Sequence, residues 1–595
     1  MKQEQLEQIY KVQNTPIVKF DGNQYTLNSK YKFGVISIQR NYALLKSKAQ
    51  SSNKIHIEFS DLDGAHEGDE VIVKVIFHPK GRIKGRVVKV LTKQYKPVLS
   101  YYHNHKFYSI KESIPLNVQI DPSNLKDFDL CIIDHEKIIN NLGSLHDPKI
   151  DETISLYMHN ELHRLEPYNL SNQITKDPLE DPTRIDLTHL DFCTIDPVGA
   201  KDFDDAIYFD QASSTLFVAI ADVSSYVLEN SLLDQEAYKR GFSIYLPNKV
   251  LPMLPFYLSN ELCSLVPHQK RAAYVFEMKL DLLSTTVEKS KVYEAVILSK
   301  NRFTYEQIDH LLETKQDSYL NELFAMTQQF RQVRLQNGYD FRNEEIRLVL
   351  DSKYNLDHQN IESSSPSHSL VEECMLLTNQ EAAKKLSSIG IFRVHDAPTS
   401  AKIFDLIEDV NILGVEAQAK QNIHETILDI QKKALQVGLK KEIDELIIKA
   451  QHQAYYSHIH QSHFGLGFEY YSHFTSPIRR YADLVLHRIL KTNQAPQDIE
   501  QICQNISDKE REIAKLVWDL EDRIYARWAN KHVGEIFMAK LIDKQTHTVL
   551  LTDPQIQGVK VQLEKYHGEQ LFSFVKVKLI SSDFISKKII GKIVY

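Results

Sequence analysis

Four aspartates fall within ten residues of the segment CTIDPVGAKDFDDAIYF, namely Asp196, Asp202, Asp204 and Asp205. Carboxylates at this spacing repel one another, and a fold tolerates them beside an apolar strand when cations neutralise their charge. Hard divalent cations prefer oxygen ligands, and no histidine or cysteine stands among the four aspartates to indicate a softer metal. The segment therefore predicts a site for a hard divalent cation.

Two other interpretations of this aspartate segment stay open at this point. An acidic loop in solvent would need no cation. A calcium-binding loop would also be rich in aspartate, but DPVGAKDFDD lacks the glycine and terminal glutamate spacing of an EF-hand. The flanking residues TID and AIYF are typical of strands, which favours carboxylates gathered at the end of a strand.

A second segment, YYSHFTSPIRRYADLVLHRIL, predicts a helix that begins with positive charge. Ser476 is suited to the N-cap and Pro477 to the first helical position. Arg479 and Arg480 then fall in the first turn, where they oppose the helix dipole unless an anion binds there. A phosphate group would satisfy the helix and the arginines together. The alternative is a surface ion pair between Arg479 and Asp483 at i,i+4.

The composition predicts a globular protein of several domains. The chain has 595 residues, of which 42% are hydrophobic and 25% charged, which indicates about three to five domains. We find no signal-like start and no uninterrupted run of about 18 apolar residues, so we expect a cytoplasmic protein without a membrane partner. The five cysteines stand far apart without CxxC spacing, which predicts neither a disulfide framework nor a zinc site.

The net charge of −8 argues against binding of a polyanion over the whole surface. Any nucleic-acid site must then follow a local basic path. The basic residues available for such a path are Lys80, Arg82, Lys84, Arg86 and Lys89, together with the two arginines of the second segment.

The elements that must position these residues divide the chain into five parts of a mixed α+β, multidomain protein. Residues 1–30 form an N-terminal extension. Short strand-like runs at 31–92 predict a five-stranded barrel of the oligonucleotide-binding type, and 93–175 predict a second, less distinct one. Residues 176–530 mix strands with long helices. Residues 531–595 return to short strands and predict a last small barrel.

Within the large central part, one β-hairpin is expected to join AIYFD to LFVAIADV through residues 211–214. Apolar residues recur at helical spacing in four stretches. These predicted helices span 370–388, 420–455, 477–491 and 497–529.

Several motifs occur in a fixed order between about 190 and 490. They are TIDPVGAKDFDDAI, VAIADVSSYV, IYLPNKVLPMLPFYLSNELCSL, VEECML, FRVHDAP and HFGLGFEYYSHFTSPIRRYADLVLHR. This series resembles the catalytic domain of the ribonuclease II/R (RNB) family of 3′–5′ exoribonucleases. Within that family it is most similar to the bacterial ribonuclease R enzymes. The resemblance implies that the N-terminal barrels are cold-shock-like, that 176–530 is an RNB catalytic domain, and that 531–595 is a short S1-like barrel.

The same resemblance implies roles for the residues of both segments. All four aspartates match the family's magnesium-binding set, in which manganese can substitute. Asp196 and Asp205 would chiefly coordinate metal, and Asp204 matches the most critical catalytic carboxylate. Asp202 would support the second metal or its water. Arg479 matches the arginine that engages the scissile phosphate, with Arg480 as its neighbour in RNA binding.

Further positions match residues with which the family contacts RNA. Tyr245 and Phe341 match aromatic residues that stack on terminal bases, although Phe341 would equally suit a core position. Glu372 would bind a ribose hydroxyl or pair with an internal cation. The sequence departs from the family where a glutamate often stands on the helix before the S1-like barrel, because Val517 occupies that place, with Glu521 one turn later.

The resemblance implies a processive, hydrolytic 3′–5′ exoribonuclease that releases nucleoside 5′-monophosphates by two-metal phosphodiester hydrolysis, with a role in RNA turnover. Its substrate would be single-stranded RNA or RNA with a 3′ overhang, and association with an RNA helicase or the ribosome is compatible with this role. A monomer is expected. Two alternatives stay open: a catalytically silent RNA-binding relative with the same fold, and a metal-dependent phosphatase or nuclease that acts on DNA.

Overall fold

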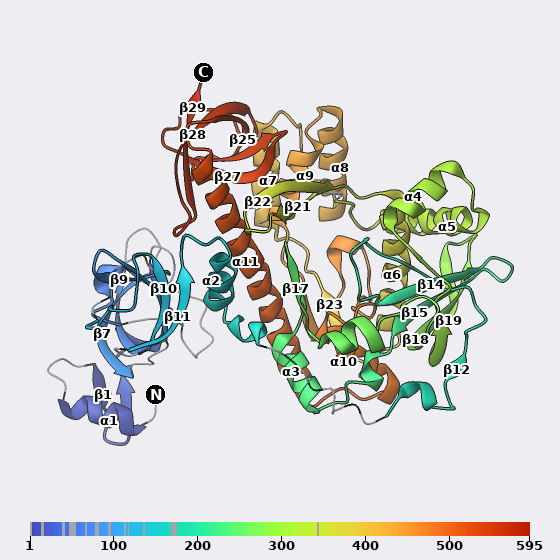
Figure 1. Cartoon of the computed structure of the whole chain (residues 1–595), viewed down its shortest axis with the longest axis horizontal. Helices are drawn as coiled ribbons and strands as arrows, with labels where there is room; N and C mark the ends of the chain where they lie inside the picture. The colour runs from blue at the N-terminus through green and yellow to red at the C-terminus, as the bar shows by residue number, and fades with distance from the viewer. Residues whose placement is uncertain are drawn as a thin grey trace. The chain divides into compact units, whose positions relative to one another are not determined.

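The structure is a computed structural model of the chain. It describes residues 3–12, 17–38, 42–46, 55–65, 68–77, 83–92, 97–111, 113, 115–116, 118–134, 137–166, 168, 170, 174, 176–341 and 344–595. The chain forms two compact units, one of residues 1–160 with 583–588 and the other of residues 161–582 with 589–595. Figure 1 labels their helices and strands.

The first unit contains the predicted N-terminal barrel, which is closed. Its strands follow the order β3-β4-β5-β7-β6. They are β3 (Tyr31–Ile38), β4 (Ala43–Lys46), β5 (Ile55–Ile57), β6 (Glu70–Phe77) and β7 (Ile83–Thr92). Alternate side chains of these strands, such as Ile36, Ile57 and Val71, fill the interior. The predicted five-stranded barrel is therefore confirmed.

Two residues of the expected basic path on this barrel have acidic partners. Lys84 pairs with Glu58, and Arg86 Nε lies 2.5 Å from Asp61 Oδ1. Lys80 and Arg82 lie outside the described residues.

The extension before the barrel carries secondary structure of its own. Helix α1 (Gln3–Val12) is followed by a hairpin of β1 (Val18–Phe20) and β2 (Tyr25–Leu27). Leu6 and Ile9 of the helix pack with Ile72 of the barrel. The extension is thus an ordered addition to the first barrel.

The second predicted barrel is a four-stranded antiparallel sheet in the described part of the chain. The strand order is β11-β10-β8-β9. The strands are β8 (Val98–His103), β9 (Lys106–Ser109), β10 (Asp129–Asp134) and β11 (Lys137–Ser144), and α2 (Ile150–Met158) follows them.

A seven-stranded sheet forms the centre of the second unit, in the order β12-β19-β18-β15-β14-β13-β20. Its strands are β12 (Ile185–Asp186), β13 (Cys193–Ile195), β14 (Asp205–Asp210), β15 (Thr215–Ala221), β18 (Lys270–Asp281), β19 (Thr286–Leu298) and β20 (Asn301–Phe303). The predicted hairpin is present, because β14 and β15 pair from Asp205↔Ile220 to Asp210↔Thr215. Buried residues such as Leu216, Val218 and Phe276 make this sheet the main core.

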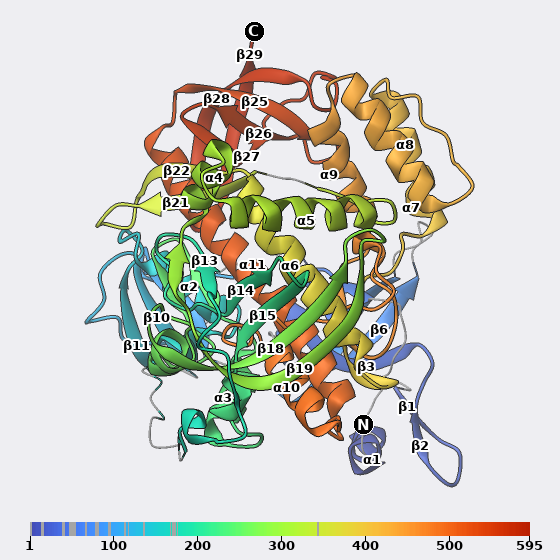
Figure 2. The ribbon, with the colours of Figure 1, turned by 90° about the vertical axis from the view of Figure 1, so that its right-hand side faces the viewer.

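Helices cover this sheet and extend from it. They are α3 (Leu232–Arg240), α4 (Tyr305–Thr314), α5 (Ser318–Arg334), α6 (Pro366–Lys384), α7 (Ser400–Ile412), α8 (Ile423–Gln436), α9 (Lys440–Ala450), α10 (Tyr481–Thr492) and α11 (Ile499–Lys531). Helices α4, α5 and α6 pack on one another beside the sheet (Figure 2). None of the helices in the described ranges is both long enough and apolar enough to cross a membrane.

The prediction of one helix over 420–455 is wrong, because α8 and α9 are separate. Gly438 lies between them with φ +74°, a backbone conformation that favours glycine and ends a helix. The N–H of Leu439 returns to the carbonyl oxygen of Ala434 (2.9 Å), which closes the end of α8. The apolar spacing continues across this turn, so periodicity alone did not reveal it.

Two short hairpins and a two-stranded sheet lie outside the main sheet, and a closed barrel follows α11. One hairpin pairs β16 (Ile244–Leu246) with β17 (Lys249–Leu251), and the other pairs β21 (Glu345–Leu350) with β22 (Leu356–Glu362). The two-stranded sheet pairs β23 (Ile389–Val394) with β24 (Tyr455–Ile459), which follows α7, α8 and α9 in the chain. The barrel consists of β25 (Ile536–Asp543), β26 (Thr548–Asp553), β27 (Ile556–Leu563), β28 (Phe574–Asp583) and β29 (Lys588–Val594). The predicted last barrel is therefore confirmed.

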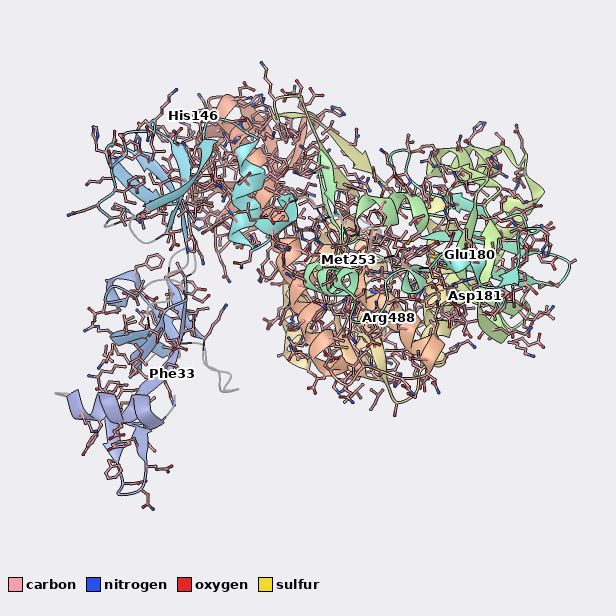
Figure 3. All side chains as sticks on the ribbon, turned by 60° about the horizontal axis from the view of Figure 1, so that its bottom comes forward. Phe33, His146, Glu180, Asp181, Met253 and Arg488 are labelled. Carbon is pink, nitrogen blue, oxygen red and sulfur yellow. The ribbon has the colours of Figure 1, made fainter. Side chains whose placement is uncertain are left out.

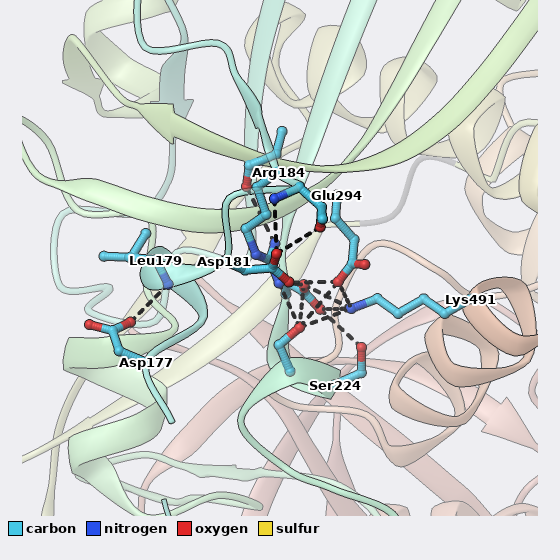
Figure 4. Close-up of polar contacts among 11 residues, drawn as sticks. Asp177, Leu179, Asp181, Arg184, Ser224, Glu294 and Lys491 are labelled. Atoms are coloured by element: carbon cyan, nitrogen blue, oxygen red, sulfur yellow. Dashed lines mark hydrogen bonds and ion pairs between the residues drawn. The ribbon is translucent and has the colours of Figure 1, made fainter. Parts of the chain in front are cut away.

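A buried charge network ties the start of the central domain to α10 (Figure 4). Asp222 is completely buried, and its carboxylate accepts from Arg184 (2.6 Å) and from Lys491 (2.6 and 2.8 Å). Lys491 also contacts Glu294 of β19 (2.6 Å). Burial opposes ionisation of Asp222, but Lys491 and Arg184 together hold its pKa well below the usual range.

We predict that Asp222→Asn lowers the free energy of unfolding by about 3 kcal/mol, because two buried cations lose their shared anion. Thermal and urea unfolding of the variant would measure this loss. Asp508→Asn removes the partner of Arg511 in an exposed pair and should change stability by less than about 1 kcal/mol. Equal stability losses in both variants would contradict the role given to the network.

Candidate active site

Asp196 lies at the end of a strand of the main sheet. It follows β13, and its N–H donates to the carbonyl oxygen of Phe303 in β20 (3.1 Å). Strands β13 and β20 run parallel with Ile195 beside Phe303. The carboxylate therefore leaves a fixed strand end, as the flanking strand-like residues predicted.

The loop between Asp196 and Asp204 is held from two sides. Arg302 donates to the carbonyl oxygens of Pro197 and Val198, both at 2.8 Å. On the other side, Ser264 Oγ accepts from the N–H of Phe203 (3.0 Å) and donates to the carbonyl oxygen of Lys201 (2.7 Å). These bonds fix the backbone from which the remaining aspartates project.

Asp204 meets the segment that carries the predicted arginine. Its Oδ1 accepts from the N–H of Ile478 (2.9 Å), and its Oδ2 lies 3.4 Å from Arg479 Nε. The side chain of Asp204 is 5% exposed, whereas that of Arg479 is 45% exposed. Two segments far apart in the sequence thus meet at one buried carboxylate, and the arginine remains open to a ligand.

The arginines precede the helix and do not form its first turn, so the predicted start at Pro477 is wrong. Helix α10 begins at Tyr481, and Arg480 has the extended backbone of φ −133° and ψ 123°. The N–H of Ser476 donates to Asp483 Oδ1 (2.8 Å). These interactions hold residues 476–480 as a turn, to which we refer as the arginine turn.

Arg480, and not Arg479, pairs with Asp483. Its Nε and Nη2 lie 2.9 Å and 2.7 Å from the two carboxylate oxygens. The side chain of Arg480 is 19% exposed. The structure therefore gives Arg480 a partner within the protein, and its expected contact with RNA stays a prediction.

Helix α10 is itself anchored behind the site. Arg488, labelled in Figure 3, donates to the carbonyl oxygen of Val227 (2.7 Å) and lies 2.8 Å from Asp234 Oδ1. Tyr481 Oη also donates to Asp234 (2.9 Å). The helix that follows the arginine turn is thus fixed to α3.

Tyr245 lies at the carboxylate cluster. It belongs to β16, and its hydroxyl donates to Asp202 Oδ2 (2.9 Å). The residue is 46% exposed, so the ring keeps a free face beside the aspartates. This position suits the stacking role implied for Tyr245.

Phe341 and Glu372 both have partners within the protein. Phe341 packs against the apolar cluster of α7, α8 and α9, 5.8 Å from the ring of Tyr339. Glu372 Oε2 accepts from Arg331 (3.2 Å), although the side chain is still 48% exposed. The structure thus agrees with a core position for Phe341 and with an internal cation for Glu372, while their expected contacts with RNA stay predictions.

Val517 and Glu521 both lie on α11, and the environment of the glutamate is unusual. Burial, with the nearby charges of Asp522 and Glu345, raises the pKa of Glu521 to about 7, although Lys560 opposes the shift. Val517 is half-buried. Glu521 therefore places a carboxyl group one turn beyond Val517, and this group ionises less readily than an ordinary glutamate.

Asp196, Asp204 and Asp205 resist ionisation. Burial, and then the charges of Asp205, Asp204 and Asp202, raise the pKa of Asp196 to about 8. Burial raises the pKa of Asp205 to about 6 against the opposing effect of Arg479, and that of Asp204 lies well above its usual range. A carboxylate cluster of this kind is completed by positive charge.

The cluster fits a divalent cation whose coordination a substrate completes. Asp196 Oδ2 and Asp204 Oδ2 are buried without a hydrogen-bond donor among the described residues. No group of three or more potential ligand side chains within those residues is already gathered around one point. Magnesium commonly uses one or two carboxylates with water and substrate phosphates, so two unsatisfied oxygens are an adequate protein contribution.

Comparisons with known proteins agree with this arrangement. The family profile for the RNB domain matches residues 184–495, and that for the ribonuclease R second OB domain matches residues 96–156. Ribonuclease R of Helicobacter pylori is 35% identical over 478 residues, which cover 76% of this chain and 73% of that protein. The chain belongs to the ribonuclease R family of 3′–5′ exoribonucleases. The predicted family is thereby confirmed.

Other members of the ribonuclease R family align with most of this chain. The Thermotoga maritima enzyme is 31% identical over 87% of this chain and 80% of its own. A solved structure of Mycoplasma genitalium RNase R in complex with ribose-methylated single-stranded RNA has a TM-score of 0.83 and 25% identity, and it covers 95% of this chain and all of the other. Yeast Ssd1, described as a pseudonuclease, has the same fold with a TM-score of 0.66, 18% identity and coverage of 90% of this chain and 79% of its own.

Sequence reasoning missed three residues that shape the site. Arg302 and Ser264 act through backbone carbonyl and amide groups, for which a sequence carries no spacing signal. Tyr305 begins α4, and after burial the charges of Asp205 and Asp196 contribute most to its raised pKa. The capping box of Thr304 and Gln307 could have placed Tyr305 in the first turn of a helix.

We predict that the cation-free protein becomes less stable as pH rises from 6 to 8. The folded state keeps a proton on Asp196 up to a pKa of about 8, whereas the unfolded chain releases it near pH 4. The folded state therefore holds more protons in this interval and loses stability as they dissociate. Thermal unfolding in EDTA would measure the slope, which Asp196→Asn should reduce.

Magnesium should restore stability at pH 8 more than at pH 6, because it replaces the lost protons. Asp191→Asn is the matched control, since this exposed residue lies outside the cluster and should leave the slope unchanged. Identical slopes for the wild-type protein and Asp196→Asn would contradict the prediction.

Proposed function

We propose that this chain is a processive, hydrolytic 3′–5′ exoribonuclease that releases nucleoside 5′-monophosphates. The observation that carries the proposal is the meeting of Asp204 with Ile478 and Arg479 beside carboxylate oxygens that accept no hydrogen bond from the described residues. An anionic cluster and an accessible cation side by side suit a phosphodiester, which brings negative oxygens and requires charge stabilisation. Its role would be RNA turnover in the cytoplasm.

Each group of the site then has a task. Arg479 would bind the non-bridging oxygens of the last phosphate and stabilise the charge that they gain in the transition state. Asp204, fixed by the N–H of Ile478, would keep this guanidinium aligned. The ring of Tyr245 would stack on the terminal base, which tolerates any sequence because each base has a π face.

The aspartates would hold magnesium, or manganese in its place. Two metal ions held in this way would supply activation of the attacking water and stabilisation of the departing 3′ oxygen, as in two-metal hydrolysis. Water adds to phosphorus while the bond to the 3′ oxygen of the preceding nucleotide breaks, so the 5′-phosphate stays with the released nucleotide. This chemistry needs no covalent intermediate with the protein.

RNA is the proposed substrate, in single-stranded form or with a 3′ overhang. Solved structures of Mycoplasma genitalium RNase R hold single-stranded RNA in one case and double-stranded RNA in another. A monomeric enzyme that associates with a helicase or the ribosome would be consistent with the family. The half-exposed ring of Tyr245 beside Asp202 supports entry of a single-stranded 3′ end.

A catalytically silent RNA-binding relative is the second candidate, because a described pseudonuclease shares the fold. The retained aspartates and the open Arg479 favour activity. A nuclease that acts on DNA would need the same carboxylates and phosphate contacts, so a DNA substrate belongs in the same assay.

We predict that Asp204→Asn slows hydrolysis on the order of a thousandfold, because the carboxylate that aligns Arg479 loses its charge. The measurement is decay of a 5′-labelled oligoribonucleotide with magnesium, compared with EDTA and with the matching DNA. Asp191→Asn, on the exposed loop before β13, serves as the control. Equal decay with the Asp204→Asn protein, or decay that needs no divalent cation, would refute the proposed activity.

We further predict that Tyr245→Ala lengthens the final oligonucleotide, because a terminal stack worth about 1–3 kcal/mol is lost. Tyr245→Phe keeps the ring and removes only the bond to Asp202, so its final product should match that of the wild-type protein. A sequencing gel resolves the products. An unchanged ladder for Tyr245→Ala would exclude the stacking role.

A further inference from the structure

A buried ion-pair cluster lies behind the arginine turn, formed by Glu161, Arg164 and Lys509. Glu161 and Arg164 belong to the segment that enters the second unit, and Lys509 lies on α11. One carboxylate oxygen of Glu161 accepts from Arg164 Nε, and the other accepts from Lys509 Nζ (2.6 Å). The side chains of Arg164 and Glu161 are 0% and 1% exposed, so neither contacts solvent or substrate directly.

The other nitrogens of Arg164 bind the main chain at the end of α3. Nη1 donates to the carbonyl oxygen of Phe242 (2.8 Å), and Nη2 donates to that of Arg240. A helix end leaves carbonyl oxygens without intrahelical partners, and Arg164 binds that of Arg240, the last residue of α3, together with that of Phe242 just beyond the helix. One guanidinium thus fixes both sides of Gly241.

Gly241 itself is confined. Its φ is +70°, and a Cβ at this position would come within 2.9 Å of Lys509 Cγ. A side chain would therefore meet both a strained backbone and the aliphatic stem of Lys509. The ion-pair cluster and residues 240–243 are packed as one block.

The same block holds the arginine turn through main-chain bonds. The N–H of Ser243 donates to the carbonyl oxygen of Arg479 (3.0 Å), and the N–H of Tyr481 donates to that of Gly241 (2.9 Å). Phe242 and Arg480 form an isolated antiparallel bridge between these bonds. The chain then continues directly into β16, which carries Tyr245.

We propose that Arg164, oriented by Glu161 and Lys509, is a positioning residue for catalysis. It sets the backbone of residues 240–243, and through that backbone the positions of Arg479 and Tyr245. This inference rests on the proposed function, because positioning matters only if Arg479 serves a reaction. A displacement of about 1 Å at a catalytic group can reduce a rate as much as a hundredfold, so a buried clamp of this kind has a kinetic effect.

The competing explanation is that the cluster contributes only to stability. A matched control separates the two, because Arg523 and Asp519 form another buried guanidinium–carboxylate pair on α11, at 2.9 Å. This contact joins two residues of one helix and includes no residue of 240–243 or of the arginine turn. Loss of that pair should lower stability without touching the site.

The test compares Arg164→Lys with Arg523→Lys in single-turnover and steady-state hydrolysis of an oligoribonucleotide with magnesium. A lysine keeps the charge but cannot bind Glu161 and two carbonyl oxygens at once. We expect the turnover rate of Arg164→Lys to fall about tenfold, with KM changed less than about twofold. Arg523→Lys should keep the wild-type rate within about twofold, even if its melting temperature falls as far as that of Arg164→Lys.

A double-mutant cycle then asks whether Arg164 acts through Arg479. In an Arg479→Ala background, Arg164→Lys should cost clearly less than about tenfold, because Arg479, one of the two groups that it positions, is already absent. A full tenfold loss in that background would overturn the proposal. So would an equal loss of rate in Arg523→Lys. Glu161→Gln, which keeps the shape and removes the charge, repeats the test if Arg164→Lys does not fold.

Hydrogen–deuterium exchange provides a measurement that is independent of activity. In Arg164→Lys the amides of residues 240–245 and 476–481 should exchange faster, while those of β18 keep their protection. Unchanged exchange in both segments would overturn the proposal. If the wild-type protein does not degrade RNA, the proposed function fails, and the exchange experiment still decides whether Arg164 fixes the arginine turn.

Discussion

The catalytic region depends on one electrostatic constraint. Several aspartate side chains are buried away from water at the ends of strands in the main sheet. Burial and the charges of the other aspartates raise the pKa of Asp196 to about 8, and burial raises that of Asp205 to about 6. Such a cluster is costly unless protons, an arginine or a metal compensate it. The loop held by Arg302 and Ser264 keeps the carboxylates together despite this cost. Rigidity of the surroundings is therefore a requirement of the site.

The sequence predicted the groups that carry charge better than the backbone that holds them. The aspartates and Arg479 could be identified from residue type, spacing and resemblance, and the two closed barrels from alternating apolar residues. The start of α10 could not, because Ser476 and Pro477 have the same local signature whether a helix or a turn follows. Its true start at Tyr481 depends on Asp204, Asp483 and residues 240–243, and such tertiary bonds override local preference.

The partner of Arg480 illustrates the same limit. A pair between Arg479 and Asp483 is natural on a continuous helix, where residues four apart share a face. Once the chain is extended at Arg480, this side chain takes the carboxylate and leaves Arg479 accessible. The extended backbone at Arg480, in place of the predicted helix, thus decides which of two adjacent arginines is available to a phosphate.

Main-chain bonds hold the arginine turn, and this has a consequence for molecular evolution. The bond from Ser243 to Arg479 and the bond from Tyr481 to Gly241 use only peptide groups, so substitutions that preserve the backbone leave them intact. Natural selection on this contact would act on glycine and on Arg164, and would leave little covariation between the paired positions. Related proteins that have lost activity could thus keep every recognisable catalytic motif while they have lost the interactions of Arg164 that hold the arginine turn.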